Sequence, residues 1–192
     1  MASMCRSSSR CCRCSSIILV LLLVDPTFSL KRELSRGFSL LTLVSMLAVF
    51  LIGGGAVAYW VAHAHPDWFL EFPRNRPDTY WTIMLLYPLM SVPAQELVYR
   101  TFFFHRYGAL FQRAWWVAIL LNAAVFGFGH IVVGTELAVV GTMATGMLFA
   151  LRYAFTRSFW AVYLEHSVWG ALVFTVGLGR FFFTGVGIVG WR

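Results

Sequence analysis

The sequence predicts an all-α protein that forms a polytopic transmembrane helical bundle with about five spans. Three observations support this fold class. Hydrophobic residues make up 59% of the 192 residues and charged residues only 12%, which is more apolar surface than a soluble domain can bury. The apolar runs are long and continuous, whereas the strands of a transmembrane barrel are short and alternate in polarity. The basic residues form short clusters between these runs, as in loops that stay in the cytoplasm.

Residues 1–36 are predicted to precede the bundle as a leader rich in Ser, Arg and Cys. The cysteines lie between Cys5 and Cys14, and no second ligand pair follows at a distance that suits zinc. The apolar run at residues 17–24 ends at Asp25 and Pro26, so it is too short for a span of about 20 residues. We therefore expect a disordered or signal-like leader, and a transmembrane domain at residues 37–192 with its motif-bearing core at about 79–178.

Five longer apolar segments follow in order along the chain. The first contains glycines near its middle, and the second contains Pro88 and Pro93, which should kink it where neighbouring groups satisfy the freed carbonyls. Trp115 and Trp116 open the third segment as anchors at the membrane interface. The predicted spans are at about residues 38–62, 79–104, 114–132, 137–155 and 158–178, and the tail at residues 180–192 is expected to lie at the membrane interface.

The distribution of charge predicts a cytoplasmic amino terminus. If Lys31 and Arg32 lie inside, five spans place Arg106 and Arg152 on the same side, in agreement with the positive-inside rule. The formal net charge of +7 is carried by these loop clusters. Because no basic and aromatic stripe lies outside the apolar segments, we expect the lipid bilayer as a partner and no nucleic acid.

Ionisable residues inside the predicted spans are few, and they come from three of the spans. Glu96 and Arg100 lie one helical turn apart on one face, His130 ends the third span, and Glu165 and His166 lie in the fifth. A charge at the bilayer centre costs about 2.5–3.5 kcal/mol on insertion scales, so such residues usually face the bundle interior and find partners. The Glu96–Arg100 pair alone fits a structural role, but with two histidines the set predicts a functional polar cluster.

A carboxylate near imidazoles suits hydrolysis by an activated water. The carboxylate can take a proton from water, and imidazole or amide donors can stabilise an oxyanion. The chain has no G-x-S-x-G motif and no H-E-x-x-H motif. We therefore expect no cofactor and no metal, and a zinc ion bound by Glu96, His130 and His166 stays open as an alternative.

Three short motifs lie in order on the second, third and fifth predicted spans. They are QELVYR (residues 95–100), FGFGH (residues 126–130) and HSVWG (residues 166–170). In order and spacing they resemble the CAAX protease and bacteriocin-processing family of intramembrane endopeptidases, also called CPBP or Abi. That family shows E-E-x-x-x-R, F-x-x-x-H, and H-x-x-x-N or a variant, and the resemblance covers about residues 79–178.

The resemblance implies an intramembrane protease in which a glutamate and a histidine activate water. Carried over by position, it implies catalytic roles for Glu96, Arg100, His130 and His166, with Phe126 opening the second motif. It also implies a membrane-associated protein or peptide substrate, and the match to a bacterial branch of the family predicts the bacterial plasma membrane. In a straight third span His130 lies near the outer end, so convergence requires that helix to tilt, start later or break at its glycines.

Two positions depart from the family pattern. Gln95 replaces the first acid of the first motif, and Gly170 replaces the final Asn of the third. Because an amide is a poor proton acceptor, we expect Glu96 to act as the base and Gln95 to supply a hydrogen bond. Glu165 is a reserve acid beside the third motif, and the missing Asn removes one candidate oxyanion donor.

Two other functions stay open. A catalytically inactive relative of this family would act in binding or immunity, and Gln95 favours it. A haem-binding membrane protein would use His130 and His166 as axial ligands, but it gives the Glu96–Arg100 pair no role. The sequence does not indicate an oligomeric state.

Overall fold

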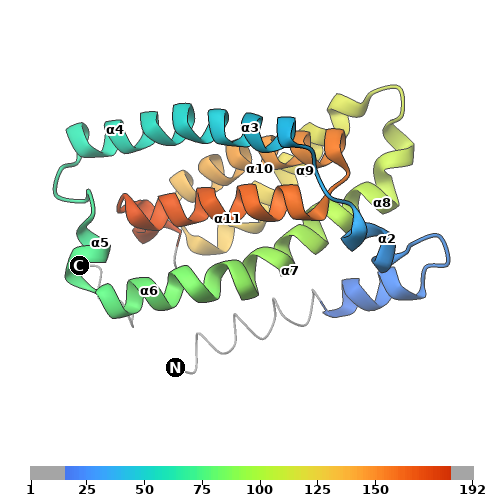
Figure 1. Cartoon of the computed structure of the whole chain (residues 1–192), viewed down its shortest axis with the longest axis horizontal. Helices are drawn as coiled ribbons and strands as arrows, with labels where there is room; N and C mark the ends of the chain where they lie inside the picture. The colour runs from blue at the N-terminus through green and yellow to red at the C-terminus, as the bar shows by residue number, and fades with distance from the viewer. Residues whose placement is uncertain (1–15, 183–192) are drawn as a thin grey trace.

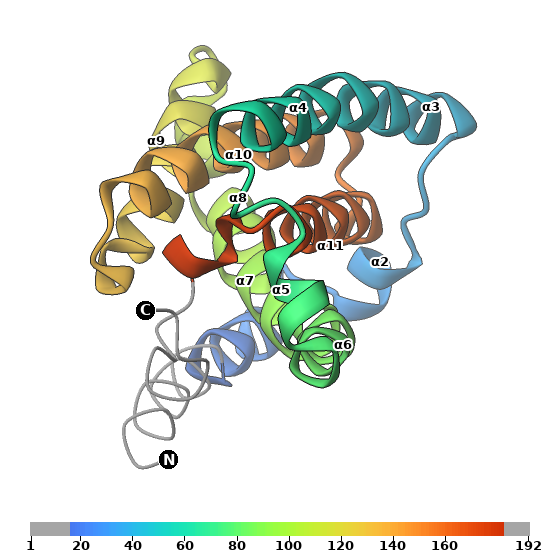
Figure 2. The ribbon, with the colours of Figure 1, turned by 90° about the vertical axis from the view of Figure 1, so that its left-hand side faces the viewer.

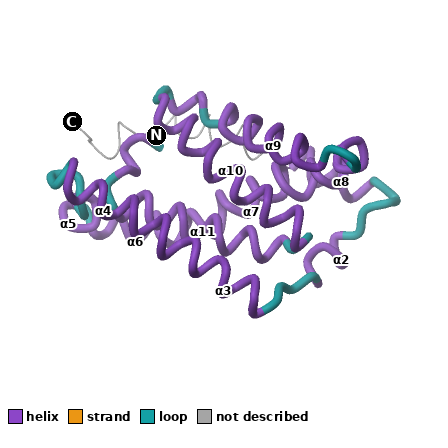
Figure 3. The backbone as a smooth tube through the Cα atoms, turned by 90° about the horizontal axis from the view of Figure 1, so that it is seen from above, coloured by secondary structure: helices purple, strands orange, loops and turns teal. Residues whose placement is uncertain are grey.

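The computed structural model describes residues 16–182, which form helices joined by loops and contain no strand (Figure 3). The all-α class predicted from composition is therefore confirmed. Residues 16–24 are helical. The α-helices that follow are α2 (Leu30–Ser35), α3 (Leu40–Val49), α4 (Gly55–Ala64), α5 (Glu71–Asn75), α6 (Pro77–Leu86), α7 (Val92–Glu96), α8 (Phe103–Tyr107), α9 (Trp115–Gly129), α10 (Glu136–Thr156) and α11 (Phe159–Thr175).

Shorter helical turns connect several of these elements. The π-helical segments are η1 (Phe50–Gly54), η2 (Tyr87–Ser91) and η3 (Leu97–Phe102), and the 3-10 segments are η4 (Gly108–Phe111), η5 (Ile131–Val133) and η6 (Leu178–Phe181). The first predicted span is thus one continuous helix from α3 to α4, and the second is continuous from α6 to α8.

The prolines of the second span explain its π-helical turns. Pro88 lies within η2, and Pro93 lies in the short helix α7 between η2 and η3. A proline has no backbone N–H and its ring meets the carbonyl four residues earlier. A wider π turn accommodates this and keeps the helix continuous, and such turns occur often at functional sites.

Helix α11 lies in the middle of the bundle. Seen along the helices, α3 and α4 cover one side of α11, α9 and α10 a second, and α6 and α7 a third (Figures 1 and 2). Helices α9 and α10 pack closely because Gly127 faces α10, where a Cβ atom would lie 2.9 Å from the carbonyl oxygen of Val139 and closer still to Met143. Small residues at such contacts allow helices to approach in a membrane.

The outer surface of the bundle is suited to lipid. Among the described residues, three helices are long and apolar enough to cross a membrane: Leu40–Ala64, Trp115–Val133 and Glu136–Thr156. Side chains on the first of them are widely exposed, including Leu41 at 77% and Ile52 at 76%, and such apolar exposure is stable in a bilayer. The chain is therefore an integral membrane protein, while the count of five spans and the cytoplasmic amino terminus stay predictions.

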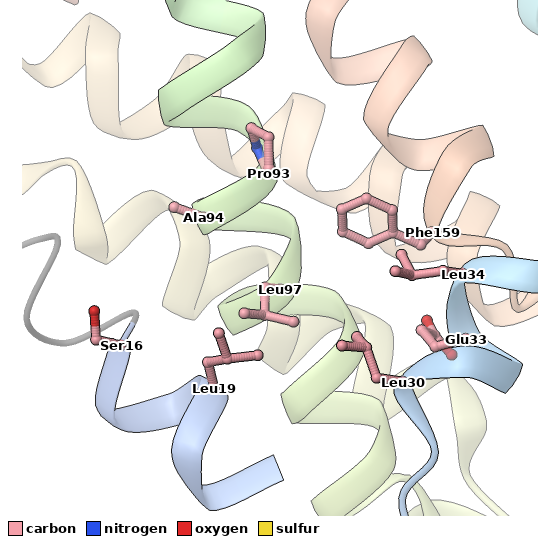
Figure 4. A pocket seen from close by; sticks show the side chains of 9 residues that line it. All are labelled: Ser16, Leu19, Leu30, Glu33, Leu34, Pro93, Ala94, Leu97 and Phe159. Atoms are coloured by element: carbon pink, nitrogen blue, oxygen red, sulfur yellow. The ribbon is translucent and has the colours of Figure 1, made fainter. Parts of the chain in front are cut away.

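Part of the predicted leader packs against the bundle. Residues 1–15, with the cysteines, lie outside the described residues, as do residues 183–192 of the predicted interfacial tail. Helix 16–24 and α2 lie beside α7 and α11 around a small cavity of about 320 Å³, where Leu19 and Leu30 approach Leu97 (Figure 4). Glu33 on α2 is buried and accepts hydrogen bonds from the Thr101 hydroxyl at 3.2 Å and the Tyr153 hydroxyl at 2.6 Å.

These contacts differ from what a disordered leader would make, although the domain boundary at residue 36 itself stays a prediction. The Trp160 indole also donates a hydrogen bond to the Leu34 carbonyl at 2.8 Å. Buried polar groups need partners in a low-dielectric interior, and Glu33 on α2 supplies one to Thr101 on η3 and to Tyr153 on α10. The described part of residues 16–36 is therefore part of the folded protein.

Candidate active site

Glu96 connects the second predicted span to the central helix. It is the last residue of α7, it is fully buried, and its Oε1 atom lies 2.6 Å from Nδ1 of His166 on α11. This distance is that of a strong, charge-assisted hydrogen bond. The structure therefore brings together the acid of the first motif and the histidine of the third, as their predicted clustering requires.

Arg100 lies on the other side of the same carboxylate. Its Nε atom is 3.5 Å from Oε2 of Glu96, which makes a loose ion pair, and its Nη2 atom donates to the Gly146 carbonyl at 3.5 Å. The guanidinium also lies over the ring of Phe126 at 4.6 Å from the centroid and near Phe149 at 5.6 Å. Such cation–π contacts contribute about 2 kcal/mol where the cation is desolvated, so aromatic rings supply much of what holds the buried cation.

Aromatic rings also fix the orientation of His166. Its imidazole stacks on Phe149 with centroids 4.7 Å apart and meets Phe126 and Tyr87 edge-on at 5.7 and 6.0 Å. Because Nδ1 is bound to a carboxylate, that nitrogen carries the proton and Nε2 keeps its lone pair in the neutral ring. The Nε2 atom, which has no hydrogen-bond partner among residues 16–182, can accept a proton, and the acid behind the ring can stabilise the resulting imidazolium.

His130 reaches the same region because α9 ends at Gly129. His130 is the residue that caps this helix, and the 3-10 turn η5 follows it. Its Nδ1 atom lies 2.8 Å from the Phe126 carbonyl oxygen, which only accepts, so Nδ1 is the donor. The ring lies 4.9 Å from that of Phe126, which also contacts His166. The break at the glycines is thus one of the routes to convergence that the sequence allowed.

A cavity of about 960 Å³ connects these groups. Gln95, His130 and His166 line it, and the part of the lining where both imidazoles contact Phe126 is called its polar end below. Most other lining side chains are apolar, and they include Trp60, Ile83, Leu86, Met90, Leu137, Leu148, Trp169, Leu172 and Val173. Glu96 does not line the cavity, so His166 separates it from this space. A ligand with a polar group at one end and an apolar chain would match this lining.

The two departures from the family pattern both lie at the cavity. The Gln95 side chain donates from Nε2 to the Ser91 hydroxyl at 2.8 Å, while its buried Oε1 atom has no hydrogen-bond partner among residues 16–182. Gly170 lies against Tyr87: a Cβ atom built on Gly170 would be 2.5 Å from Cζ of that ring and closer still to its hydroxyl oxygen. The phenol thus fills the space that a side chain at position 170 would need.

Glu165 does not join the cluster. Its carboxylate accepts two hydrogen bonds from Arg152, at 2.9 and 3.0 Å, and Arg152 also donates to the Ser45 hydroxyl at 2.7 Å. The side chain does not line the large cavity. This arrangement ties α10 to α11 and α3, and it occupies both carboxylate oxygens of the residue expected as a reserve acid.

Within residues 16–182 no group of three or more His, Cys, Asp or Glu side chains is arranged to hold a metal ion. In the zinc alternative Glu96 would be a ligand, but its carboxylate oxygen is bound to Nδ1 of His166. A catalytic zinc usually has three protein ligands, and His130 and His166 offer two free nitrogens. The absence of a metal or other cofactor stays a prediction.

Two aromatic residues at the site were not singled out from the sequence. Tyr87 and Phe149 contact His166, but each lies within an apolar segment among many other aromatic residues. Aromatic residues make up 17% of the chain, so composition gives no signal that separates them. Only the packing of η2 and α10 against α11 identifies them.

The fold and the cluster define a helical membrane protein with a buried carboxylate–imidazole pair at the polar end of an apolar cavity. A family model described as type II CAAX prenyl endopeptidase Rce1-like matches residues 77–172, which is half of the chain. The chain belongs to this Rce1-like family, and the predicted resemblance is confirmed. Neither a curated protein nor a solved structure matches the chain.

Proposed function

We propose that the chain is an intramembrane endopeptidase in which the Glu96–His166 pair activates a water molecule to hydrolyse a peptide bond. The observation that carries this proposal is the 2.6 Å contact between Glu96 and His166, with His166 at the lining of the large cavity. Membership in an endopeptidase family supports the same reaction class. The substrate is a membrane-associated protein or peptide whose scissile bond enters the polar end of the cavity.

The proton follows a balanced route through the imidazole. A water in the cavity gives a proton to Nε2 of His166, and the hydroxide attacks the carbonyl carbon of the peptide bond. Glu96 stabilises the imidazolium that forms, and the Nε2 proton then passes to the leaving amine as the carbon–nitrogen bond breaks. His130, whose Nδ1 atom is bound to the Phe126 carbonyl, offers Nε2 as a second acceptor that orients the water. In this scheme the base role expected of Glu96 is exerted through His166.

The apolar part of the cavity would hold the part of the substrate that lies beyond the scissile bond. Its lining would hold a long apolar chain by van der Waals packing, because such a chain enters from lipid and not from water. The family description names prenylated CAAX substrates, which carry such a chain. For this protein the same lining fits any substrate that presents an apolar anchor beside its scissile bond, and the bacterial plasma membrane is the proposed location.

A reconstituted cleavage assay tests the proposal. The purified full-length protein in lipid nanodiscs should cleave a fluorogenic peptide tethered to the same bilayer. His166→Ala and Glu96→Gln should each lower turnover by about 10²–10⁴-fold, because each removes part of the general base. Ser167→Ala is the matched control: its hydroxyl donates to the Tyr163 carbonyl at 2.7 Å on the same helix, and turnover should be retained. Normal turnover in Glu96→Gln would contradict the assignment.

An inactive relative is the second candidate, and Gln95 favours it because an amide lies where the family pattern has an acid. Wild-type protein that cleaves none of a broad set of tethered peptides, while remaining folded, would support this candidate. The haem alternative has a separate readout, since a protein that binds haem through two histidines shows a Soret band after purification.

A further inference from the structure

Tyr87 places a hydroxyl group at the cavity without a protein partner. It is the first residue of η2, it lines the large cavity, and its ring meets His166 and Phe174 edge-on at 6.0 and 5.6 Å. Within residues 16–182 its hydroxyl makes no hydrogen bond, whereas that of Tyr80, two helical turns earlier, lies 3.0 Å from the Thr175 hydroxyl. Tyr87 is partly buried, and tyrosine hydroxyls in such positions usually find a partner, so this one is available to a ligand.

The position of Gly170 fixes where this hydroxyl lies. Gly170 and His166 are one turn apart on α11, so they share a face of that helix. A Cβ atom at Gly170 would overlap the end of the Tyr87 ring, including its hydroxyl oxygen. The absence of a side chain at Gly170 therefore allows the phenol to lie on the face of α11 that presents His166.

The proposed hydrolysis needs a hydrogen-bond donor for its oxyanion, and the two neutral histidines do not supply one. In their neutral forms both imidazoles use Nδ1 as the donor to protein groups, Glu96 and the Phe126 carbonyl, and both present Nε2 as an acceptor. The tetrahedral intermediate carries an oxyanion that needs a hydrogen-bond donor. A phenol O–H is such a donor, and the lining of the cavity brings it to the polar end that holds His166.

We propose that Tyr87 is a further catalytic residue whose hydroxyl donates a hydrogen bond to the oxyanion, from the space left by Gly170. This inference rests on the proposed hydrolytic function and names a donor for its intermediate. Because the oxyanion forms only along the reaction, the hydroxyl acts on turnover and not on ground-state binding.

The first test removes the hydroxyl and keeps the ring. Tyr87→Phe should lower kcat by about 10²-fold, the usual effect of losing one oxyanion donor, with KM within about twofold of wild type. The thermal unfolding midpoint should stay near that of wild type. Tyr80→Phe is the matched control: it loses the hydrogen bond to Thr175, so it should lower the unfolding midpoint and leave kcat unchanged. A Tyr87→Phe protein with wild-type kcat overturns the inference.

The second test moves the hydrogen-bond donor from Tyr87 on η2 to position 170 on α11. Tyr87→Ala removes the phenol, and the double variant Tyr87→Ala/Gly170→Asn places an amide donor in the freed volume. It should recover about tenfold of the lost kcat, whereas Tyr87→Ala/Gly170→Leu, which has similar size and no donor, should recover none. Equal recovery by Asn and Leu would show that filling space matters, and it would overturn the donor role.

These outcomes separate the two proposals. If wild-type protein is inert, the proposed hydrolysis fails and Tyr87 fails with it. If wild-type protein cleaves its substrate and His166→Ala does not, the hydrolysis stands, and the Tyr87→Phe result then decides the present inference by itself.

Discussion

Glu165 and Glu96 are both buried and each pairs with an arginine, and the two pairs differ in how completely their polar atoms are satisfied. Glu165 receives two hydrogen bonds from Arg152, at 2.9 and 3.0 Å, and a third donor of Arg152 reaches Ser45. Glu96 and Arg100 approach only to 3.5 Å. Within residues 16–182, Oε2 of Glu96 and both Nε and Nη1 of Arg100 have no hydrogen-bond partner.

The difference shows which pair is structural. The Arg152–Glu165 pair joins separate helices with the bidentate geometry that makes such pairs strong. Glu96 and Arg100 lie on one continuous helix, so their pairing joins nothing, and the link to α11 is made by His166 instead. Unsatisfied buried polar groups in a folded protein call for an explanation, and a catalytic role is one of them. We therefore assign the catalytic role to the Glu96–Arg100 pair, whose hydrogen bonding is incomplete.

The largest expected effect is a loss of unfolding free energy when the Arg152–Glu165 pair is broken. Glu165→Gln leaves the Arg152 guanidinium, whose side chain is 13% exposed, without a counter-charge, and breaking a buried pair in this way costs at most about 3–5 kcal/mol of unfolding free energy. Turnover per folded molecule should be retained, in contrast to Glu96→Gln. Thermal unfolding in detergent, with turnover normalised to the folded fraction, measures both quantities. A Glu165→Gln protein that folds as wild type but does not turn over would return Glu165 to the role of reserve acid.

A smaller effect should follow when an acid is added at the cavity. Gln95→Glu places a carboxylate at the lining that His130 and His166 share, where Ser91 can donate to it. A second base beside the water should raise turnover by about tenfold, at the lower end of general-base effects. Turnover should also gain a dependence on pH in the acidic range, because the new carboxylate must be ionised to act.

The control for this variant is Thr82→Glu, which adds a carboxylate to the same cavity lining on α6. Position 82 precedes Gln95 by about 20 Å of helix at 1.5 Å per residue, so this variant should give no gain. A Gln95→Glu protein slower than wild type would mean that the amide is part of a working site, and that the Glu96–His166 pair suffices as the base.

Local patterns in the sequence were enough for the fold class and for much of the cluster. Long apolar runs identify the helices because a bilayer admits few other structures. Rare ionisable residues within them identify Glu96, Arg100, His130 and His166, because the cost of burying charge makes their presence informative. The glycines before His130 also indicated where the third span could break, and α9 does end at Gly129.

The partners of these residues depend on tertiary packing, which no local pattern encodes. Glu165 is adjacent to His166 in sequence, yet its carboxylate bonds to Arg152, which was assigned to a cytoplasmic loop. Glu33 lies in the segment set aside as a leader, yet it is buried against Tyr153, far along the chain. Neighbours on a helix point about 100° apart, so each of these acids meets a different set of helices from the residue beside it.

Asp25, a third carboxylate that lies outside the membrane-spanning segments, should give the smallest change in stability. It can be compared with the changes expected at Glu165 and Glu96. Asp25 accepts hydrogen bonds from the Thr27 hydroxyl at 2.6 Å and the Thr27 backbone N–H at 2.8 Å, and it lies 3.1 Å from Nε2 of His105. These hydrogen bonds, those of Thr27 first, lower the pKa of Asp25 from 3.8 to about 2. A lowered pKa means that the ionised form is favoured in the folded state.

The sign of the pH dependence follows from this shift. The contribution of Asp25 to stability is present above its unfolded pKa of 3.8 and is lost as the pH falls through about 2. The unfolding midpoint of Asp25→Asn should therefore lie slightly below that of wild type at pH 5, and the gap should close between pH 4 and pH 2. Asp67→Asn, which removes an exposed carboxylate with no hydrogen bond from the described residues, should show no such closing gap. Because the hydrogen-bond partners of Asp25 are Thr27 and His105 and not residues of the cluster, turnover at pH 7 should not change. If the difference in unfolding midpoint between Asp25→Asn and wild type stayed constant down to pH 2, the Asp25 side chain would act through packing and not through its charge. The hydrogen bonds of Asp25 would then say nothing about how the buried pairs respond to charge.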